Sequence, residues 1–546
     1  MGVIPLPHKK TVALIRVAIQ AGGFCSRRGL QELQTPELQQ LMTDAPRTGK
    51  EQPRSRPVKS GAEQPILPGF YPDPTVCRVG EDFYLANSSF EYFPAVPIWH
   101  SKDLLNWSQL GHALTRRTQF RDGFPWPSSG IYAPTLRHHD SRFWLVTTNI
   151  SDFDSGQILV STSDPAGPWS DPVFIPAARG IDPDLCWDGD TCFLSWRTLD
   201  PGAEHGLLQA RLDTATGQLI GSPYPIWQGS GLHGPEGPHL YHIGEYWYLL
   251  LAEGGTERGH VVTAARAPHP WGPFEPCPRN PIFTHRSLGL SVQNTGHADL
   301  VQTPAGEWAA VYLGTRPRGF TPGFHVLGRE TFIAGVTWED GWPQFDEHRY
   351  DVPVPCTDFV DDFTAPELHG RWIAPYAEPE TIADHVGTSG LVLPPVREGA
   401  TGLLCTRVRD HEWTAEAVIE DGGLFSVRLD DRHWYGVHLE NGTVRAEAQV
   451  GDLHQQLGAR LVTQGELVLR IESLPPIPHP NTYGHGGPDD ILLSVDDSEG
   501  RHDLARIDGR YLSTEVATGF TGRMLAIGSG ATSARVRSVS YRAGIG

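Results

Sequence analysis

The sequence predicts an all-β protein, a five-bladed β-propeller followed by a β-sandwich, in a chain of 546 residues. Three observations support this fold class. A motif recurs five times between residues 73 and 315, short alternating strands follow from residue 403, and 60 Gly and 47 Pro supply the turns that such folds need. Long amphipathic helical patterns are missing from both regions.

Each copy of the motif has a lead residue, a small or Pro step, an apolar residue, a polar turn and an aromatic-rich run. The leads are Asp73, Ala133, Asp182, Glu236 and His297, spaced by 60, 49, 54 and 61 residues. A period near 50 with one hairpin per unit is typical of a propeller, with one blade per repeat. Equivalent positions then lie on a ring around the axis, so four of the five leads bring Asp, Glu or His into one pocket.

The chain divides into three predicted regions. Residues 1–64 carry ten basic and five acidic residues and form a poorly ordered basic extension, whereas the rest of the chain has a net charge of −25. Residues 65–352 form the propeller. After a proline-rich join at 351–356, residues 357–546 form the sandwich, in which turns recur about every ten residues.

Charge and cysteine content exclude several classes of partner. The net charge of −20 argues against nucleic acid or an anionic membrane and is compatible with a neutral ligand. No apolar run reaches the roughly 18 residues that a membrane span needs. Seven scattered Cys without Cys-x-x-Cys spacing argue against a zinc site and favour free thiols, hence the cytoplasm over secretion.

Three carboxylates around one axis indicate glycosidic-bond hydrolysis. That reaction needs one carboxylic acid to protonate the leaving oxygen and one carboxylate to activate water or attack directly. A third carboxylate raises the pKa of the acid, because like charges oppose ionisation. Asp73, Asp182 and Glu236 are therefore the candidate catalytic residues.

Each candidate residue also has a purely structural interpretation. An Asp-Pro step at a strand start is usually turn chemistry, and Asp184 competes with Asp182, which holds the repeat register. His297 is equally well explained as a buried, hydrogen-bonded His. Arg316 ends the fifth repeat and is placed to pair with the acids. Aromatic residues usually fill space between blades, and only Phe90 and Tyr132, which flank the lead positions, are candidates for stacking on a sugar ring.

At these residues the chain resembles glycoside hydrolase family 43, in particular its β-xylosidase and α-L-arabinofuranosidase members. The matching strings are PGFYPDPTV, NSSFEYFPAVPIWHSKDLLNW, GIYAPTLR, GIDPDL, PEGPHLY, AEGGT, QNTGHADLV and LGTRP, which cover the whole propeller in order. The region from DDFTAPELHGRW onward resembles the concanavalin-like jelly-roll sandwich that follows the propeller in many members.

The resemblance implies a five-bladed propeller, an inverting single displacement and a set of roles. Asp73 matches the general base, Glu236 the general acid and Asp182 the carboxylate that tunes and orients the acid. The substrate-binding positions are matched by Phe90, Tyr132, which stands where many members have Trp, His297 and Arg316. His297 also matches a histidine that in some members holds a structural calcium through water; no other cofactor is implied.

The sequence therefore predicts a hydrolase that releases xylose from the non-reducing ends of β-1,4-xylo-oligosaccharides, with arabinofuranose release as a second activity. Two alternatives stay open: a dedicated α-L-arabinofuranosidase, and a non-catalytic carbohydrate-binding propeller. A binder would need the aromatic residues but not three carboxylates in register. The partner is a small oligosaccharide, and the sequence leaves homo-oligomerisation open.

Overall fold

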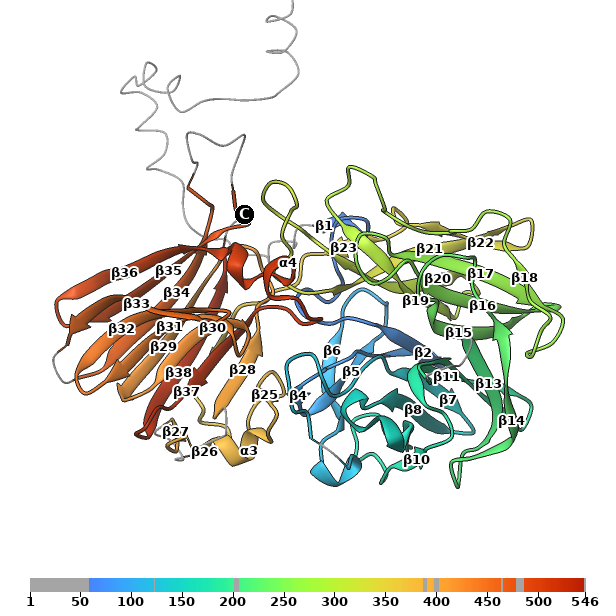
Figure 1. Cartoon of the computed structure of the whole chain (residues 1–546), viewed down its shortest axis with the longest axis horizontal. Helices are drawn as coiled ribbons and strands as arrows, with labels where there is room; N and C mark the ends of the chain where they lie inside the picture. The colour runs from blue at the N-terminus through green and yellow to red at the C-terminus, as the bar shows by residue number, and fades with distance from the viewer. Residues whose placement is uncertain are drawn as a thin grey trace, which may run out of the picture. The chain divides into compact units, whose positions relative to one another are not determined.

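The computed structural model describes residues 58–121, 123–200, 206–385, 390–396, 402–462, 465–477 and 486–544. Residues 57–546 form one compact unit. Strands make up most of its regular structure, which confirms the all-β class (Figure 1). The described helices are short: α3 (Pro379–Ile382), α4 (Thr514–Ala517) and the 3-10 turns η1 (Arg117–Gln119), η2 (Ile150–Ser155) and η4 (Gly509–Leu512).

Most of the predicted basic extension, residues 1–57, lies outside the described residues. Its last residues are described and belong to the compact unit. There β1 (Val58–Ser60) pairs with β23 (Asp351–Pro353), so the chain at residue 60 lies beside the chain at residue 351.

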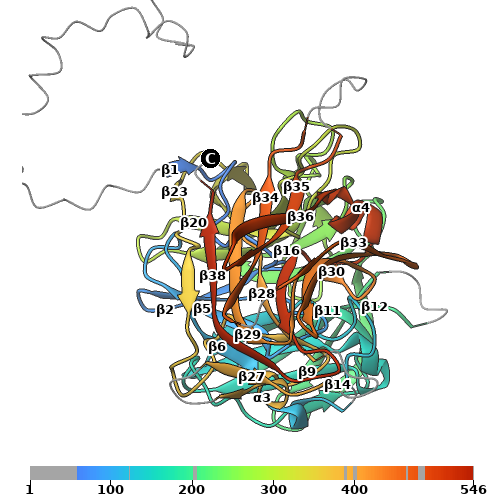
Figure 2. The same ribbon diagram turned by 90° about the vertical axis from the view of Figure 1, so that its left-hand side faces the viewer.

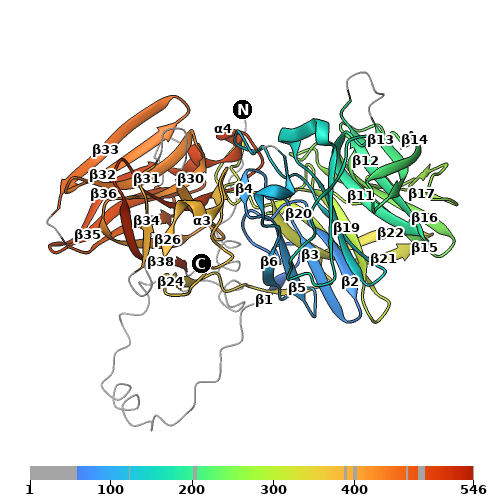
Figure 3. The same ribbon diagram turned by 90° about the horizontal axis from the view of Figure 1, so that it is seen from below.

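Five four-stranded antiparallel sheets follow one another along residues 75–346, each with its strands in chain order. The first sheet is β2 (Thr75–Val79), β3 (Asp82–Ala86), β5 (Ala95–Ser101) and β6 (Ser108–Leu114), drawn in blue in Figure 3. The second is β7 (Thr135–His139), β8 (Arg142–Thr148), β9 (Gln157–Thr162) and β10 (Val173–Ile175). The third is β11 (Gly180–Asp188), β12 (Thr191–Thr198), β13 (Leu207–Asp213) and β14 (Gln218–Trp227). The fourth is β15 (Glu236–Ile243), β16 (Tyr246–Glu253), β17 (Val261–Ala267) and β18 (Glu275–Pro276), and the fifth is β19 (Gln293–Gln302), β20 (Trp308–Thr315), β21 (Glu330–Glu339) and β22 (Trp342–Asp346).

The first strands of these sheets contact one another in a circuit. Strand β2 contacts β7, then β7 contacts β11, β11 contacts β15, β15 contacts β19, and β19 contacts β2 again. An apolar cluster joins the first and last sheets through Val76, Leu85 and Val311, which are all buried. Each repeat of the sequence thus supplies one sheet, and the repeat's lead residue lies within that sheet's first strand or two residues before it.

The C-terminal region contains two larger sheets (Figure 2). One runs β26 (Asp384–His385), β27 (Leu391–Leu393), β38 (Ala534–Ala543), β29 (Trp413–Asp421), β34 (Leu467–Leu474), β35 (Asp490–Asp497), β36 (Gly500–Asp508), with β24 (Phe359–Asp361) also on β38. The other runs β28 (Leu403–Arg407), β37 (Met524–Gly528), β30 (Leu424–Asp430), β31 (His433–Glu440), β32 (Thr443–Val450), β33 (Leu453–Leu461). Val427 and Tyr435 of the second sheet share one apolar core with Leu469 and Ile491 of the first.

The C-terminal region is bound to the five small sheets by polar and apolar contacts. The short strand β4 (Tyr92–Phe93) pairs with β25 (Ala374–Pro375), and the Arg407 Nε donates a hydrogen bond to the Phe70 carbonyl at 2.7 Å. Phe70, Phe90 and Met524 are fully or almost fully buried in one cluster. Among the described residues, no helix is long and apolar enough to cross a bilayer.

Candidate active site

The first strands present their lead residues through irregular backbone. Asp73, Asp182 and His297 all adopt left-handed conformations, with φ of 51°, 54° and 49°. The ladder register shifts across the lead in β11 and β19 and directly after the lead in β15. Such bulges and left-handed residues cost energy in an ordinary strand, and they re-aim side chains at functional sites.

These side chains meet in one cavity. Its volume is about 70 Å³, and it is lined by Asp73, Phe90, Tyr132, Ala133, Ile181, Asp182, Glu236, Thr256, His297, Arg329 and Phe520. The structure therefore brings together six of the seven residues that the sequence singles out. The lead of the second repeat, Ala133, lines the same cavity.

The Asp73 carboxylate is held in its ionised form. Its Oδ1 accepts a hydrogen bond from Arg329 Nη1 at 2.8 Å, and its Oδ2 accepts one from Ser88 Oγ at 2.5 Å. Burial alone would raise the pKa of Asp73, but the charges of Arg329 and His297 together with the Ser88 hydrogen bond hold it below its ordinary value. An ionised carboxylate is the form that can accept a proton from water.

The pKa values of Glu236 and Asp182 are shifted upward, opposite to that of Asp73. Burial, together with the negative charge of Asp73, raises the pKa of Glu236 against the opposing effect of Arg197, whose Nη1 pairs with Glu236 Oε2. Burial and the charges of Glu236 and Asp73 raise the pKa of Asp182 well above its ordinary value. The Gly237 N–H donates to Asp182 Oδ2 at 3.1 Å. The cavity thus holds one carboxylate that favours ionisation and two that resist it.

His297 is buried next to these groups. Burial lowers its pKa to about 4, so the imidazole is neutral near pH 7. Its Nδ1 lies 3.8 Å from Asp73 Oδ1. Within the described part of the chain, no three His, Cys, Asp or Glu side chains converge as ligands for a metal ion.

Arg316 lies elsewhere. Its guanidinium forms two hydrogen bonds to Glu330, at 2.6 Å and 2.8 Å, and it does not line the cavity. Arg329, next to Glu330 in the sequence, occupies the position expected of Arg316: it pairs with Asp73, and its guanidinium lies over the rings of Phe90 and Phe520. Arg329 and Phe520 also line the cavity but are not predicted from the sequence, because neither is the lead residue of a repeat.

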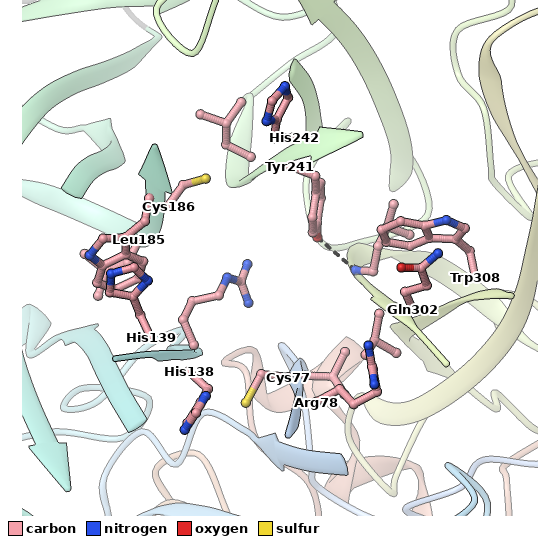
Figure 4. Close-up of a pocket in the computed structure, with 16 residues that line it drawn as sticks. Cys77, Arg78, His138, His139, Leu185, Cys186, Tyr241, His242, Gln302 and Trp308 are labelled. Carbon is pink, nitrogen blue, oxygen red and sulfur yellow. Dashed lines mark hydrogen bonds between the residues drawn. The ribbon is translucent and has the colours of Figure 1, made fainter. Parts of the chain in front are cut away.

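A second cavity of about 370 Å³ opens further along the same first strands, among side chains that include Tyr241, His138 and Trp308 (Figure 4). The Arg137 guanidinium lines this second cavity, and both of its terminal nitrogens donate hydrogen bonds. Its Nη1 donates to Asp299 Oδ2 at 2.8 Å and to the Leu136 carbonyl at 3.0 Å, and its Nη2 donates to Asp184 Oδ1 at 2.8 Å. With its terminal donors used and two carboxylates compensating its charge, Arg137 has a structural role there.

Paired carboxyl groups in unequal electrostatic surroundings, set in an all-β fold, are the kind of groups that glycosidic-bond hydrolysis uses. Residues 62–343 match the model of the glycosyl hydrolases family 43, and the chain belongs to this family.

Curated relatives and solved structures agree with this assignment. A xylosidase/arabinosidase of Butyrivibrio fibrisolvens is 46% identical over 294 residues, which are 52% of this chain and 56% of that protein. A non-reducing end α-L-arabinofuranosidase of Bacteroides ovatus is 45% identical over 51% of this chain and 52% of its own length. The chain thus spans about half the length of these curated relatives. The structure of a xylan β-1,4-xylosidase from Bacillus halodurans superposes with a TM-score of 0.79 and 28% identity, over 88% of this chain and 99% of that one.

Proposed function

We propose that this protein hydrolyses glycosidic bonds with inversion and releases xylose from the non-reducing ends of β-1,4-xylo-oligosaccharides. Arabinofuranose release is proposed as a second activity of the same cavity. The observation that carries the proposal is that Asp73 and Glu236 line one cavity in unequal surroundings: Asp73 is bonded to Arg329 and Ser88, which hold its pKa below the ordinary value, whereas burial raises the pKa of Glu236. Inverting hydrolysis needs one carboxyl group in each state.

In this proposal Asp73 is the general base that takes a proton from the attacking water. Glu236 is the general acid that protonates the oxygen of the leaving sugar. Asp182 is the carboxyl group that tunes and orients the acid: ionisation of Asp182 and ionisation of Glu236 oppose each other, and Asp182 accepts a hydrogen bond from the N–H of Gly237, the residue after Glu236. Arg329 orients Asp73, and the rings of Phe90 and Tyr132 stack against the sugar.

A dedicated α-L-arabinofuranosidase is the second candidate. It is supported by the name of the Bacteroides ovatus relative, which is 45% identical to the matched segment. A non-catalytic carbohydrate-binding protein would have no use for the opposed pKa shifts of Asp73 and Glu236, so we do not favour it.

We further propose that the five small sheets are the blades of a propeller spanning residues 65–352 and that the two large sheets form a sandwich spanning 357–546. The circuit of contacts between first strands and the shared core of the large sheets support this interpretation. A calcium ion held through water by His297, a cytoplasmic location and self-association remain predictions from the sequence. His297 offers one nitrogen to such an ion, whereas calcium prefers six to eight oxygen ligands.

The experiment that tests the proposal compares leaving groups in Glu236→Ala. An activated aryl β-xyloside needs little proton donation, but xylobiose needs it fully. We expect the variant to lose at least tenfold more activity on xylobiose than on the aryl xyloside. Equal losses on both substrates would remove Glu236 from the role of acid, and wild-type hydrolysis of aryl α-arabinofuranoside alone would select the second candidate.

A further inference from the structure

Three hydrogen bonds converge on Ser128, a residue outside the cavity lining. The Ser128 N–H donates to Glu91 Oε2 at 3.0 Å. Its carbonyl accepts a hydrogen bond from the Tyr132 hydroxyl at 3.1 Å, and its Oγ accepts one from the Phe520 N–H at 2.9 Å. Ser128 adopts a left-handed conformation with φ of 59°, which a serine keeps only where its surroundings enforce it.

Two of these partners, Tyr132 and Phe520, form part of the wall of the catalytic cavity. The Phe520 ring stacks on Phe90 with centroids 5.6 Å apart and meets Tyr132 edge-on at 6.0 Å. Phe520 is 392 positions away from Ser128 in the sequence and belongs to the C-terminal region. The Ser128 hydroxyl therefore joins this distant aromatic residue to the loop that carries Tyr132.

Close packing at this contact shows that it is specific. Gly519 has φ of +87°, and a Cβ at this position would lie 2.6 Å from Ser128 Oγ. Any side chain at residue 519 would thus both strain the backbone and push the serine hydroxyl away from Phe520.

Glu91 anchors the other side of Ser128. Its side chain is buried, and burial raises its pKa to about 8. Within the described part of the chain, its Oε1 has no hydrogen-bond partner. A buried carboxyl group with one oxygen unbonded costs free energy. The hydrogen bond from the Ser128 N–H to the other oxygen offsets part of this cost and fixes the position of Ser128.

We propose that Ser128 is a positioning residue that holds Phe520 against Phe90 and Tyr132, so that the C-terminal region completes the sugar-binding wall of the cavity. This inference rests on the proposed function. Ser128 does not touch substrate; it acts through the Phe520 ring, and its loss should weaken sugar binding more than it slows bond cleavage.

The test is a double-mutant cycle on Ser128→Ala and Phe520→Ala, with Ser129→Ala as the matched control. Ser129 is a buried neighbour whose Oγ donates to the Trp126 carbonyl at 2.5 Å, and it is not among the residues that line the cavity. Xylose binding is measured by calorimetry, and KM and kcat are measured on an aryl β-xyloside. One neutral hydrogen bond corresponds to about 0.5–1.5 kcal/mol, or roughly a 2- to 12-fold change.

We expect Ser128→Ala to raise KM and weaken xylose binding by roughly 2- to 12-fold, with kcat changed less than KM. In the Phe520→Ala background the same substitution should have little further effect, because no ring remains to be positioned. Ser129→Ala should leave KM unchanged. Glu91→Gln, which keeps an amide oxygen as acceptor, should resemble wild type, whereas Glu91→Ala should resemble Ser128→Ala.

The inference is overturned if Ser128→Ala leaves KM and xylose binding unchanged, if Ser129→Ala raises KM equally, or if the two substitutions act independently. Failure of the proposed function gives a different result. A wild-type protein that binds xylose without hydrolysing any xyloside would refute the activity, and the binding cycle would still decide the role of Ser128. Absence of xylose binding in every variant would refute both.

Discussion

Two clusters of buried carboxylates lie close together on the same first strands, and they are built in opposite ways. On β11, Asp182 lines the catalytic cavity, whereas Asp184, two residues further along, accepts a hydrogen bond from Arg137. On β19, His297 lines the cavity, whereas Asp299, again two residues further, is bonded to the same guanidinium. Asp182 and His297 have left-handed backbone and line the cavity, whereas Asp184 and Asp299, past the shift in register, bond to Arg137.

The difference lies in charge compensation. Burial would raise the pKa of Asp299, but Arg137 and the hydrogen bond from Tyr241 hold it far below its ordinary value. Asp182 is raised well above its ordinary value by burial and by the nearby charges of Glu236 and Asp73. The Arg137 cluster therefore stabilises the fold, and the cavity keeps unfavourable electrostatics that only function explains.

The largest expected effect is on activity at the cavity. Asp73→Asn cannot accept a proton from water, so kcat should fall by roughly 10²–10⁴-fold. The folded structure should persist, because the amide oxygen can still accept the hydrogen bond of Arg329 while the amide NH2 can donate to the Ser88 hydroxyl oxygen. Steady-state kinetics together with thermal unfolding check this prediction. An active Asp73→Asn enzyme would show that the base lies elsewhere.

The next effect is on stability at the Arg137 cluster. Arg137→Met leaves two buried carboxylates without their cation, so the free energy of unfolding should fall by about 3–5 kcal/mol. The low pKa of Asp299 implies that its contribution is present at neutral pH and lost as the pH falls below its ordinary value of 3.8. The difference between wild type and variant in urea denaturation should therefore shrink in acid. An equal difference at pH 3 and pH 7 would contradict this account.

A smaller effect is expected on the pH dependence of activity at the cavity. Arg197 lowers the pKa of Glu236, so Arg197→Gln should raise that pKa and move the basic limb of the pH–rate profile to higher pH. Asp182 and Glu236 are a pair of carboxyl groups in which ionisation of one opposes ionisation of the other, so Asp182→Asn removes this repulsion and should move the same limb to lower pH. If the basic limb moved in the same direction in both variants, or stayed in place in both, these residues would not tune the pKa of the acid.

The sequence predicted those parts of the site that are set by repetition. Asp73, Asp182, Glu236 and His297 share one register, and the preference for Asp182 over Asp184 follows from that register alone. Asp184 instead serves the Arg137 cluster, a pairing between separate repeats that no local pattern reveals.

Residues outside the register could not be predicted with the same success. Arg316 and Arg329 lie 13 positions apart, and both are near Glu330 in the fold; only the three-dimensional structure shows that Arg316 pairs with Glu330 while Arg329 reaches Asp73. Phe520 comes from a loop of the C-terminal region, and its place in the cavity depends on packing between distant segments.

The measurement that tests the central claim most directly is proton NMR of the sugar first released from a β-xyloside. If Asp73 activates water while Glu236 protonates the leaving group in a single displacement, the α-anomer of xylose must appear first, and the β-anomer must follow only by mutarotation. Initial appearance of the β-anomer would require a covalent intermediate and would contradict the roles assigned to Asp73 and Glu236.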